Sequence, residues 1–105
     1  MDEPMIYTVE ISENAAQMLV SHATFLGHIS INAADELIQA FEDAASSLEL
    51  LPKRCPFLTD ENIPKNLYRY LIFEKRYMLI YKIIENVVYI DYVIDCRQDY
   101  GWLIK

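Results

Sequence analysis

The stretch YRYLIFEKRYMLIYKII, residues 68–84, places tyrosine, arginine and lysine side chains among aliphatic residues. Cations at such positions can hold a phosphate or a carboxylate, and tyrosines can donate a proton, stack or pack in a core. The same mixture therefore fits catalysis, binding of an anionic partner, or packing alone. The direction of each side chain decides among these, and that direction depends on the elements that carry the residues.

Charge is segregated along the chain. The formal net charge of −7 argues against a general polyanion binder, because nonspecific nucleic-acid affinity comes from cations that neutralise phosphates. Residues 1–52 contain nine acidic residues and no Lys or Arg, whereas residues 53–105 contain all nine basic residues and seven acidic ones. An anionic partner would therefore dock on the second half, unless the acids of the first half simply solvate helix surfaces.

Two cysteines and two histidines are the remaining candidates for chemistry. Cys55 and Cys96 belong to no C-x-x-C motif, and we expect both to be reduced thiols. His22 and His28 lie six residues apart and do not share a helix face. We therefore expect no metal and no cofactor. The chain starts with acidic residues, and no apolar run approaches about 18 residues, so a cytoplasmic protein without a membrane partner is expected.

Hydrophobic periodicity predicts the elements of the first half. Residues 5–12, MIYTVEIS, alternate like a half-buried strand. Ser12 is a typical N-cap, and a helix is predicted from there to Gly27. A second helix is predicted from near Asn32 to Pro52, antiparallel to the first because the connection is short. Its apolar stripe consists of Leu37, Phe41, Ala44, Ala45, Leu48 and Leu51.

The second half predicts a sheet. Residues 53–66 contain two prolines and no sustained period, so they form a loop. Three strand patterns follow, at residues 67–74, 76–84 and 87–95. A tight turn near Glu74 and Lys75 joins the first two, and the three form an antiparallel meander. The order β, α, α, β, β, β predicts a single α+β domain over residues 1–105, with the helical hairpin on one face of the sheet.

Strand alternation assigns each side chain to one face of that sheet. The face away from the helices is predicted to carry Arg69, Leu71, Phe73, Met78, Ile80, Lys82, Tyr89, Asp91 and Val93. The face under the helices is predicted to carry Tyr68, Tyr70, Ile72, Leu79, Tyr81, Ile90 and Ile94. The first face combines apolar side chains with cations, so it can accept an amphipathic segment with acidic flanks, or a second copy of the chain in a homodimer.

Three short sequence patterns, together with the predicted order of elements, are similar to those of a known protein family. Y-R-x-L at residues 68–71, R-Y-x-L-x-Y at 76–81 and V-x-D-C-R-Q-D-Y at 93–100 resemble the RelE/ParE superfamily of bacterial toxins, and the resemblance covers nearly the whole chain. It implies the toxin of a type II toxin–antitoxin, or plasmid stabilisation, module that inhibits growth and is bound by an acidic antitoxin. The RelE branch cleaves messenger RNA on the ribosome, whereas the ParE branch acts against DNA gyrase and lacks the nuclease residues.

The residues of the nuclease branch are only partly present. By the resemblance, Arg69 and Arg97 match basic positions. In a nuclease, Lys82 would be an auxiliary cation and Tyr100 would donate a proton or stack on a base, unless Tyr100 only covers the sheet edge. Two further basic positions hold Leu71 and Met78, which cannot stabilise a phosphorane. Asp95, Cys96 and Gln98 also depart from the pattern near the last strand, where Asp99 is a candidate partner for Arg97.

These departures favour a toxin that binds a protein target in the ParE manner. The expected binding residues are Arg69, Leu71, Phe73, Met78, Ile80, Lys82 and Arg97. The alternative is a ribosome-dependent endoribonuclease of RelE type, with Arg69, Arg97 and Tyr100 as catalytic residues. A third interpretation is an inactive orphan member that only binds. The target would be DNA gyrase in the first case and the ribosome in the second.

Overall fold

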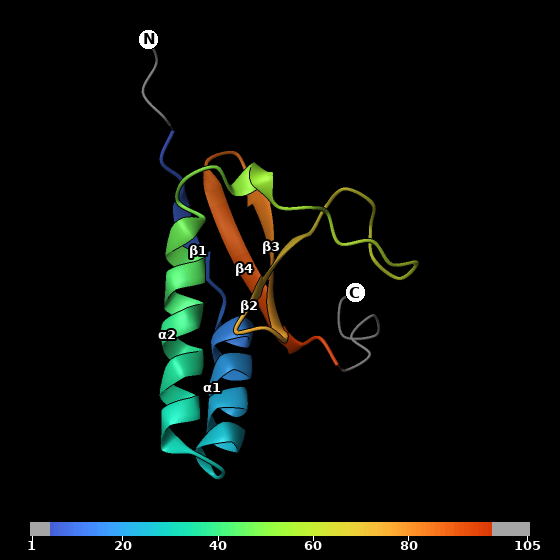
Figure 1. The fold of residues 1–105 in the computed structure, drawn as a ribbon. Helices are drawn as coiled ribbons and strands as arrows, with labels where there is room; N and C mark the ends of the chain where they lie inside the picture. The colour runs from blue at the N-terminus through green and yellow to red at the C-terminus, as the bar shows by residue number, and fades with distance from the viewer. Residues whose placement is uncertain (1–4, 98–105) are drawn as a thin grey trace.

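The computed structural model describes residues 5–97 and shows a four-stranded sheet with two helices on one face (Figure 1). The elements are β1 (Thr8–Ile11), α1 (Glu13–Gly27), α2 (Ile31–Ser47), a 3-10 helix (Pro52–Arg54), β2 (Arg69–Phe73), β3 (Tyr77–Ile84) and β4 (Val87–Asp95). The strand order is β1-β4-β3-β2, with β1 parallel to β4 and the other pairs antiparallel. The predicted α+β architecture is confirmed. No helix in the described part of the chain is long and apolar enough to cross a bilayer.

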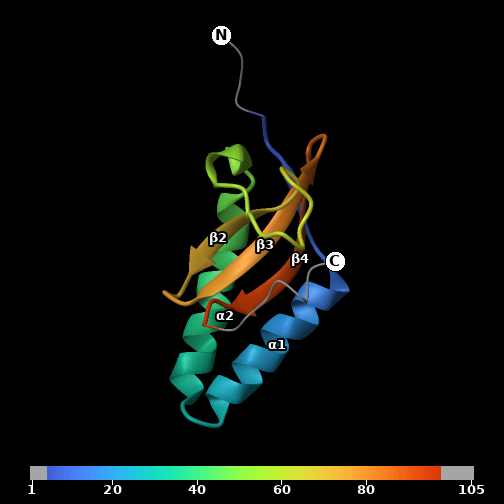
Figure 2. The same cartoon turned by 90° about the vertical axis from the view of Figure 1, so that its right-hand side faces the viewer.

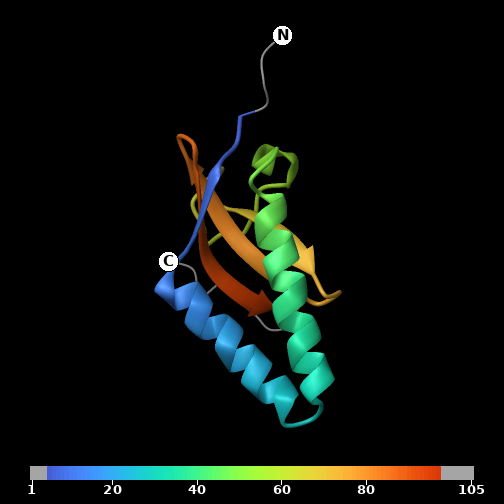
Figure 3. The same ribbon diagram turned by 90° about the vertical axis from the view of Figure 1, so that its left-hand side faces the viewer.

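Capping side chains fix where both helices begin. The Ser12 hydroxyl accepts the backbone N–H of Ala15, and the Ser30 hydroxyl accepts that of Ala33. Each bond satisfies a backbone donor that the first helical turn leaves free. The helices meet at one end and diverge toward the other, as Figure 3 shows from the helix side. The second helix ends at Ser47 rather than at Pro52, so Leu51, predicted on its buried stripe, lies beyond it and is 72% exposed.

The core between helices and sheet is apolar and aromatic. Phe41 of α2 is 3% exposed and meets Phe73 of β2 edge to face, with ring centroids 5.8 Å apart. Tyr81 is fully buried, and its hydroxyl donates to the Pro52 carbonyl at 2.7 Å. The largest buried residues of this core are Leu26, Leu37, Phe41, Leu48, Phe73, Tyr77, Leu79, Tyr81, Val88, Ile90 and Val93. Burial of these side chains is the main favourable term that holds the helices on the sheet.

The face assignment of β2 was wrong because the β2–β3 connection has three residues rather than two. Phe73 pairs with Tyr77 and Leu71 with Leu79, so Leu71 and Phe73 point toward the helices. A two-residue turn at Glu74 and Lys75 would have paired Phe73 with Arg76. A shift of one residue moves every side chain of a strand to the opposite face. Tyr68 and Tyr70 therefore lie on the face away from the helices, and Ile72, expected under the helices, is 50% exposed.

A β-bulge in β4 produced the second error. Tyr81 pairs with Ile90 but Ile80 pairs with Tyr92, so Asp91 is an extra residue in β4. Beyond a bulge the alternation of side chains is inverted. Val93 therefore packs in the core under the helices, whereas Ile94, predicted there, packs on the other face.

The second face, away from the helices, is covered in part by the segment between the 3-10 helix and β2. Leu58 and Ile63 of this segment pack against Met78 and Ile80, which are 5% and 0% exposed. Figure 2 shows the segment crossing in front of the sheet. Met78 and Ile80 lie on the face predicted for them, but that face is less open at these positions than the sequence indicated.

We expect Phe41→Ala to lower the free energy of unfolding by about 3–5 kcal/mol, because a buried ring is replaced by a cavity between α2 and β2. Phe25→Ala is the matched control, since Phe25 is 63% exposed on α1. That variant should change stability by less than about 1 kcal/mol. Urea unfolding of both variants measures the difference, and equal losses would contradict the assigned helix phase.

Candidate functional site

The side chain of Arg69 binds backbone carbonyls of the segment that follows α2. Its guanidinium donates to the carbonyl oxygen of Cys55 at 2.6 Å and to that of Lys53 at 3.1 Å. It also lies over the ring of Phe57, 3.9 Å from the centroid. Each bond fixes a carbonyl that would otherwise need water. Arg69 therefore positions residues 53–57, while its positive charge is left without a carboxylate partner among the described residues.

Lys82 belongs to a polar cluster on the second face, which we call the Tyr68–Lys82–Asp91 cluster. The Asp91 Oδ2 atom lies 3.1 Å from the Lys82 amine and accepts the Tyr68 hydroxyl at 3.2 Å. The amine also lies 5.7 Å from the centre of the Tyr68 ring. Burial, and then the charge of Asp91, raise the pKa of the Tyr68 phenol far above its ordinary value, so it remains a proton donor at neutral pH. The sequence analysis placed Lys82 and Asp91 on this face but missed the cluster, because the register error in β2 assigned Tyr68 to the face under the helices.

Arg97 forms a two-pronged ion pair with Asp95. Its Nη2 and Nε atoms donate to the two carboxylate oxygens at 2.9 and 3.2 Å, and its backbone N–H donates to Oδ1 at 2.9 Å. The hydrogen bonds from Arg97 lower the pKa of the buried Asp95 carboxyl, and the same contact raises the pKa of Arg97. The partner predicted for Arg97, Asp99, and the predicted proton donor Tyr100 lie outside the described residues.

The three predicted cations do not converge. Arg69 pairs with Tyr81 and so points to the helix side, whereas Lys82, the next residue along β3, points to the second face. Arg97 follows Asp95, whose partner on β3 is Tyr77, five residues from Lys82. At the rise of an extended strand this separation is roughly 16 Å. Stabilising a phosphorane needs donors preorganised around one phosphate, and these three side chains are not arranged in that way.

The apolar members of the predicted site divide between the two faces. Leu71 and Phe73 pack toward the helices, while Met78 and Ile80 lie beneath Leu58 on the second face. Around these buried residues, the second face still presents Ile72, which is exposed, and Tyr70 and Tyr92, which are half-buried. The candidate binding face therefore consists of Tyr70, Ile72, Tyr92 and the Tyr68–Lys82–Asp91 cluster.

Comparison with known proteins identifies the architecture. No protein-family model matches the sequence, and no curated protein sequence matches it significantly. Among solved structures, a chain of the chromosomal ParDE toxin–antitoxin system from P. aeruginosa superposes with a TM-score of 0.69 at 13% identity, over 87% of this chain and 97% of that one. A chain of the RelBE2 toxin–antitoxin complex from Mycobacterium tuberculosis gives a TM-score of 0.60 at 22% identity, over 90% and 97%.

The chain has the RelE/ParE fold. Within this fold, the resemblance implies basic residues at positions 71 and 78, but the side chains at both positions pack against the protein. Leu71 is partly buried against the helix-side core, and Met78 is buried beside Ile63. An arginine at position 78 would have to displace that cover to reach a phosphate. The RelE/ParE fold of this chain therefore places apolar packing where the nuclease interpretation requires a cation.

We expect the pKa of Asp95 to rise toward its ordinary value in Arg97→Gln, because the hydrogen bonds from Arg97 are the largest cause of its lowering. The folded-state pKa lies below the unfolded value of about 3.9, so the stabilisation is present above that pH and is lost as pH falls through the folded pKa. Wild-type protein should therefore resist acid unfolding to lower pH than Arg97→Gln. Carboxyl NMR titration measures the shift.

Arg76→Gln is the control for this titration, because the charge of Arg76 makes a smaller contribution to the lowered pKa of Asp95. Its shift should be the smaller of the two. An Asp95 pKa that stayed unchanged in Arg97→Gln would show that the ion pair is absent in solution.

Proposed function

We propose that this protein is the toxin of a bacterial type II toxin–antitoxin module. The observation that carries the proposal is the similarity of fold to chains from the ParDE and RelBE2 systems, which extends over 97% of each of those chains. A match of this extent leaves little of either neighbour without a counterpart. The proposal includes a small antitoxin partner, and the gene beside this one should encode a short acidic protein.

We further propose that the toxin acts by binding a protein target in the ParE manner, with DNA gyrase as the target. The support is that each of the three candidate cations is bound to another group of the protein and that the three do not converge on one site. Lys82 and Arg97 are each paired with a carboxylate, and Arg69 is bound to backbone carbonyls. Partly buried apolar and aromatic side chains surrounded by satisfied polar groups suit a protein interface better than they suit phosphate chemistry. The second face, with Ile72 exposed on its edge strand β2, is the proposed contact surface.

Regulated expression in a bacterial host tests this function. We expect growth arrest with altered plasmid supercoiling and intact messenger RNA. Purified protein added to translating ribosomes should give no cuts detectable by primer extension. Discrete cuts in the ribosomal A site that disappear in Arg97→Ala or Tyr100→Phe would replace the binding mechanism with the RelE-type nuclease. Verified expression without any arrest would favour the inactive orphan.

A pair of variants tests the proposed contact surface. Ile72→Asp places a charge on the second face, and it should relieve growth arrest because a desolvated, unpaired carboxylate weakens an interface by about tenfold or more. Ile38→Asp introduces the same change on α2, where Ile38 is 37% exposed, and should leave the arrest intact. Circular dichroism verifies that both variants fold. Relief of arrest by Ile38→Asp alone would move the contact surface to the helices.

A further inference from the structure

The chain bends sharply after α2, at residues 50–55, which we call the Leu50–Leu51 knuckle. Three side chains donate to its backbone: Arg54 to two carbonyls at 3.1 Å, Tyr81 to one at 2.7 Å, and Arg69 to two at 2.6 and 3.1 Å. The accepting carbonyls belong to Leu50, Leu51, Pro52, Lys53 and Cys55. Five carbonyls held within six residues fix the knuckle in one conformation.

This rigid backbone holds an apolar side chain in a strained and exposed position. Leu51 has φ 54° and ψ 49°, in the left-handed region that a leucine adopts only at a steric cost. Its side chain is nevertheless 72% exposed, and that of Leu50 is 51% exposed. Neither side chain gains core packing that would offset the strain. Strain of this kind persists only where the surrounding structure over-determines it, and it is concentrated at functional sites.

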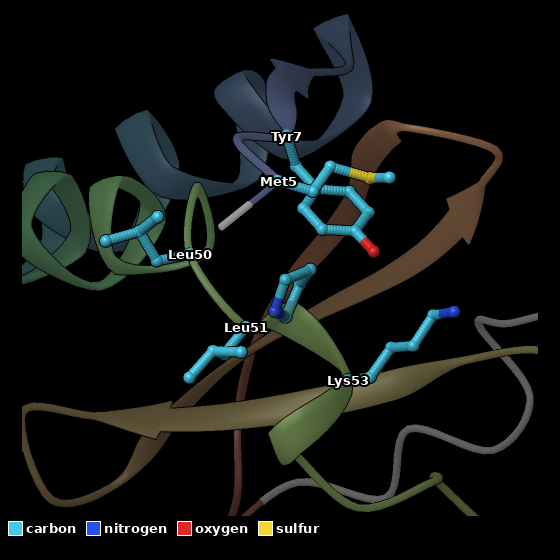
Figure 4. Close-up of a pocket in the computed structure, with 6 residues that line it drawn as sticks. Met5, Tyr7, Leu50, Leu51 and Lys53 are labelled. Atoms are coloured by element: carbon cyan, nitrogen blue, oxygen red, sulfur yellow. The ribbon is translucent and has the colours of Figure 1, made fainter. Parts of the chain in front are cut away.

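The knuckle forms one wall of an apolar pocket of about 340 Å³ (Figure 4). The lining residues are Met5, Tyr7, Leu50, Leu51, Pro52 and Lys53. Lys53 is the one charged residue among them. A pocket of this size accommodates one or two aliphatic side chains of a partner, and the fixed conformation of its wall reduces the entropy lost on binding.

Three basic residues in or bound to the pocket wall are not neutralised by an ion pair within the described part of the chain. Lys53, Arg54 and Arg69 have no carboxylate partner among residues 5–97, because the ion pairs there involve only Lys82 and Arg97. Arg54 and Arg69 are bound to neutral oxygen atoms, which orient their guanidinium groups without cancelling their charge. An apolar pocket beside three such cations is complementary to an aliphatic side chain flanked by carboxylates.

We propose that the Leu50–Leu51 knuckle is a docking site for an acidic peptide segment that inserts an aliphatic anchor between Tyr7 and Leu51. The inference rests on the proposed function in one respect, which is that the antitoxin would supply this segment. The knuckle lies apart from the second face, so one partner can occupy it while leaving the Tyr68–Lys82–Asp91 cluster free, or can reach both along its length.

The test is NMR titration of the ¹⁵N-labelled protein with a blocked synthetic peptide, Glu-Glu-Leu-Leu-Glu-Glu, and with its counterpart in which lysine replaces glutamate. We expect the acidic peptide to shift the amide signals of residues 50–55 and Tyr7, and the basic peptide to leave them unchanged. In Leu51→Gly the affinity for the acidic peptide should fall at least about tenfold, because the anchor contact is lost. Lys53→Glu should also lower this affinity.

Thermal unfolding separates a docking role from a structural one. Leu51→Gly relieves a left-handed leucine, so Tm should rise by about 2–5 °C even as peptide binding is lost. Glu74→Gly is the matched control, since Glu74 has φ 47° and belongs to the β2–β3 connection, which lies at the opposite end of the sheet from the 3-10 helix (Figure 1). It should also raise Tm, and it should leave peptide binding unchanged.

Four outcomes would overturn the inference: shifts confined to the second face, equal shifts by the basic peptide, undiminished shifts in Leu51→Gly, or weakened binding in Glu74→Gly. Growth arrest without peptide binding at the knuckle would overturn this inference and leave the proposed function standing. Peptide binding at the knuckle without growth arrest would confirm an acidic-peptide site and favour the inactive orphan over an active toxin. The two proposals therefore fail separately.

Discussion

The pairing of Phe73 with Tyr77 is the constraint on which the rest of the sheet depends. It fixes the register of β2 against β3, so it sends Leu71 and Phe73 toward the helices. It also sends Arg69 to the side where the chain leaves α2, and there the guanidinium binds the segment that connects helices to sheet. One residue fewer in the connection would have moved all three side chains to the second face. The cation that the nuclease interpretation needs is thus used instead to fix the backbone of a loop.

The bulge at Asp91 has the complementary effect on the other side of the sheet. Asp91 lies beside Lys82 and Tyr68, on the face that alternation also predicts for it, and the bulge brings Tyr92 to the same face. Lys82 is neutralised by this carboxylate, and Tyr68 gains an acceptor for its hydroxyl. A polar cluster whose members satisfy one another can be covered by a partner at little desolvation cost, whereas an isolated lysine cannot. The Asp91 carboxylate therefore makes the second face suitable for protein contact.

The sequence predicted the elements and their order well, because the period of the apolar residues and the N-cap at Ser12 are local signals. It failed where a single inserted residue changes a register. A turn of two or three residues at Glu74 and a bulge at Asp91 leave almost the same hydrophobic pattern, yet each exchanges the faces of the residues that follow. The predicted binding site inherited the first error, which placed Arg69, Leu71 and Phe73 on the wrong face. The end of α2 failed for a related reason, since Leu51 continues the helical stripe in sequence but follows a backbone turn that the stripe cannot reveal.

In the folded chain, the basic side chains of the second half differ in whether a carboxylate neutralises their charge. Of the basic side chains in the second half, Lys82 and Arg97 lie within 3.1 Å of carboxylate oxygens and contribute little net field. Carbonyl acceptors orient Arg54 and Arg69 equally well but leave a full positive charge on each. At an effective dielectric constant near 20, a carboxylate about 4 Å from such a charge gains roughly 4 kcal/mol of Coulomb energy, before desolvation is subtracted. Screening limits this attraction to about 8 Å at physiological salt, so it acts only on groups that reach the knuckle itself. Among residues 5–97, Lys53, Arg54 and Arg69 therefore leave unpaired positive charge beside the knuckle, where it coincides with an apolar side chain held exposed under strain.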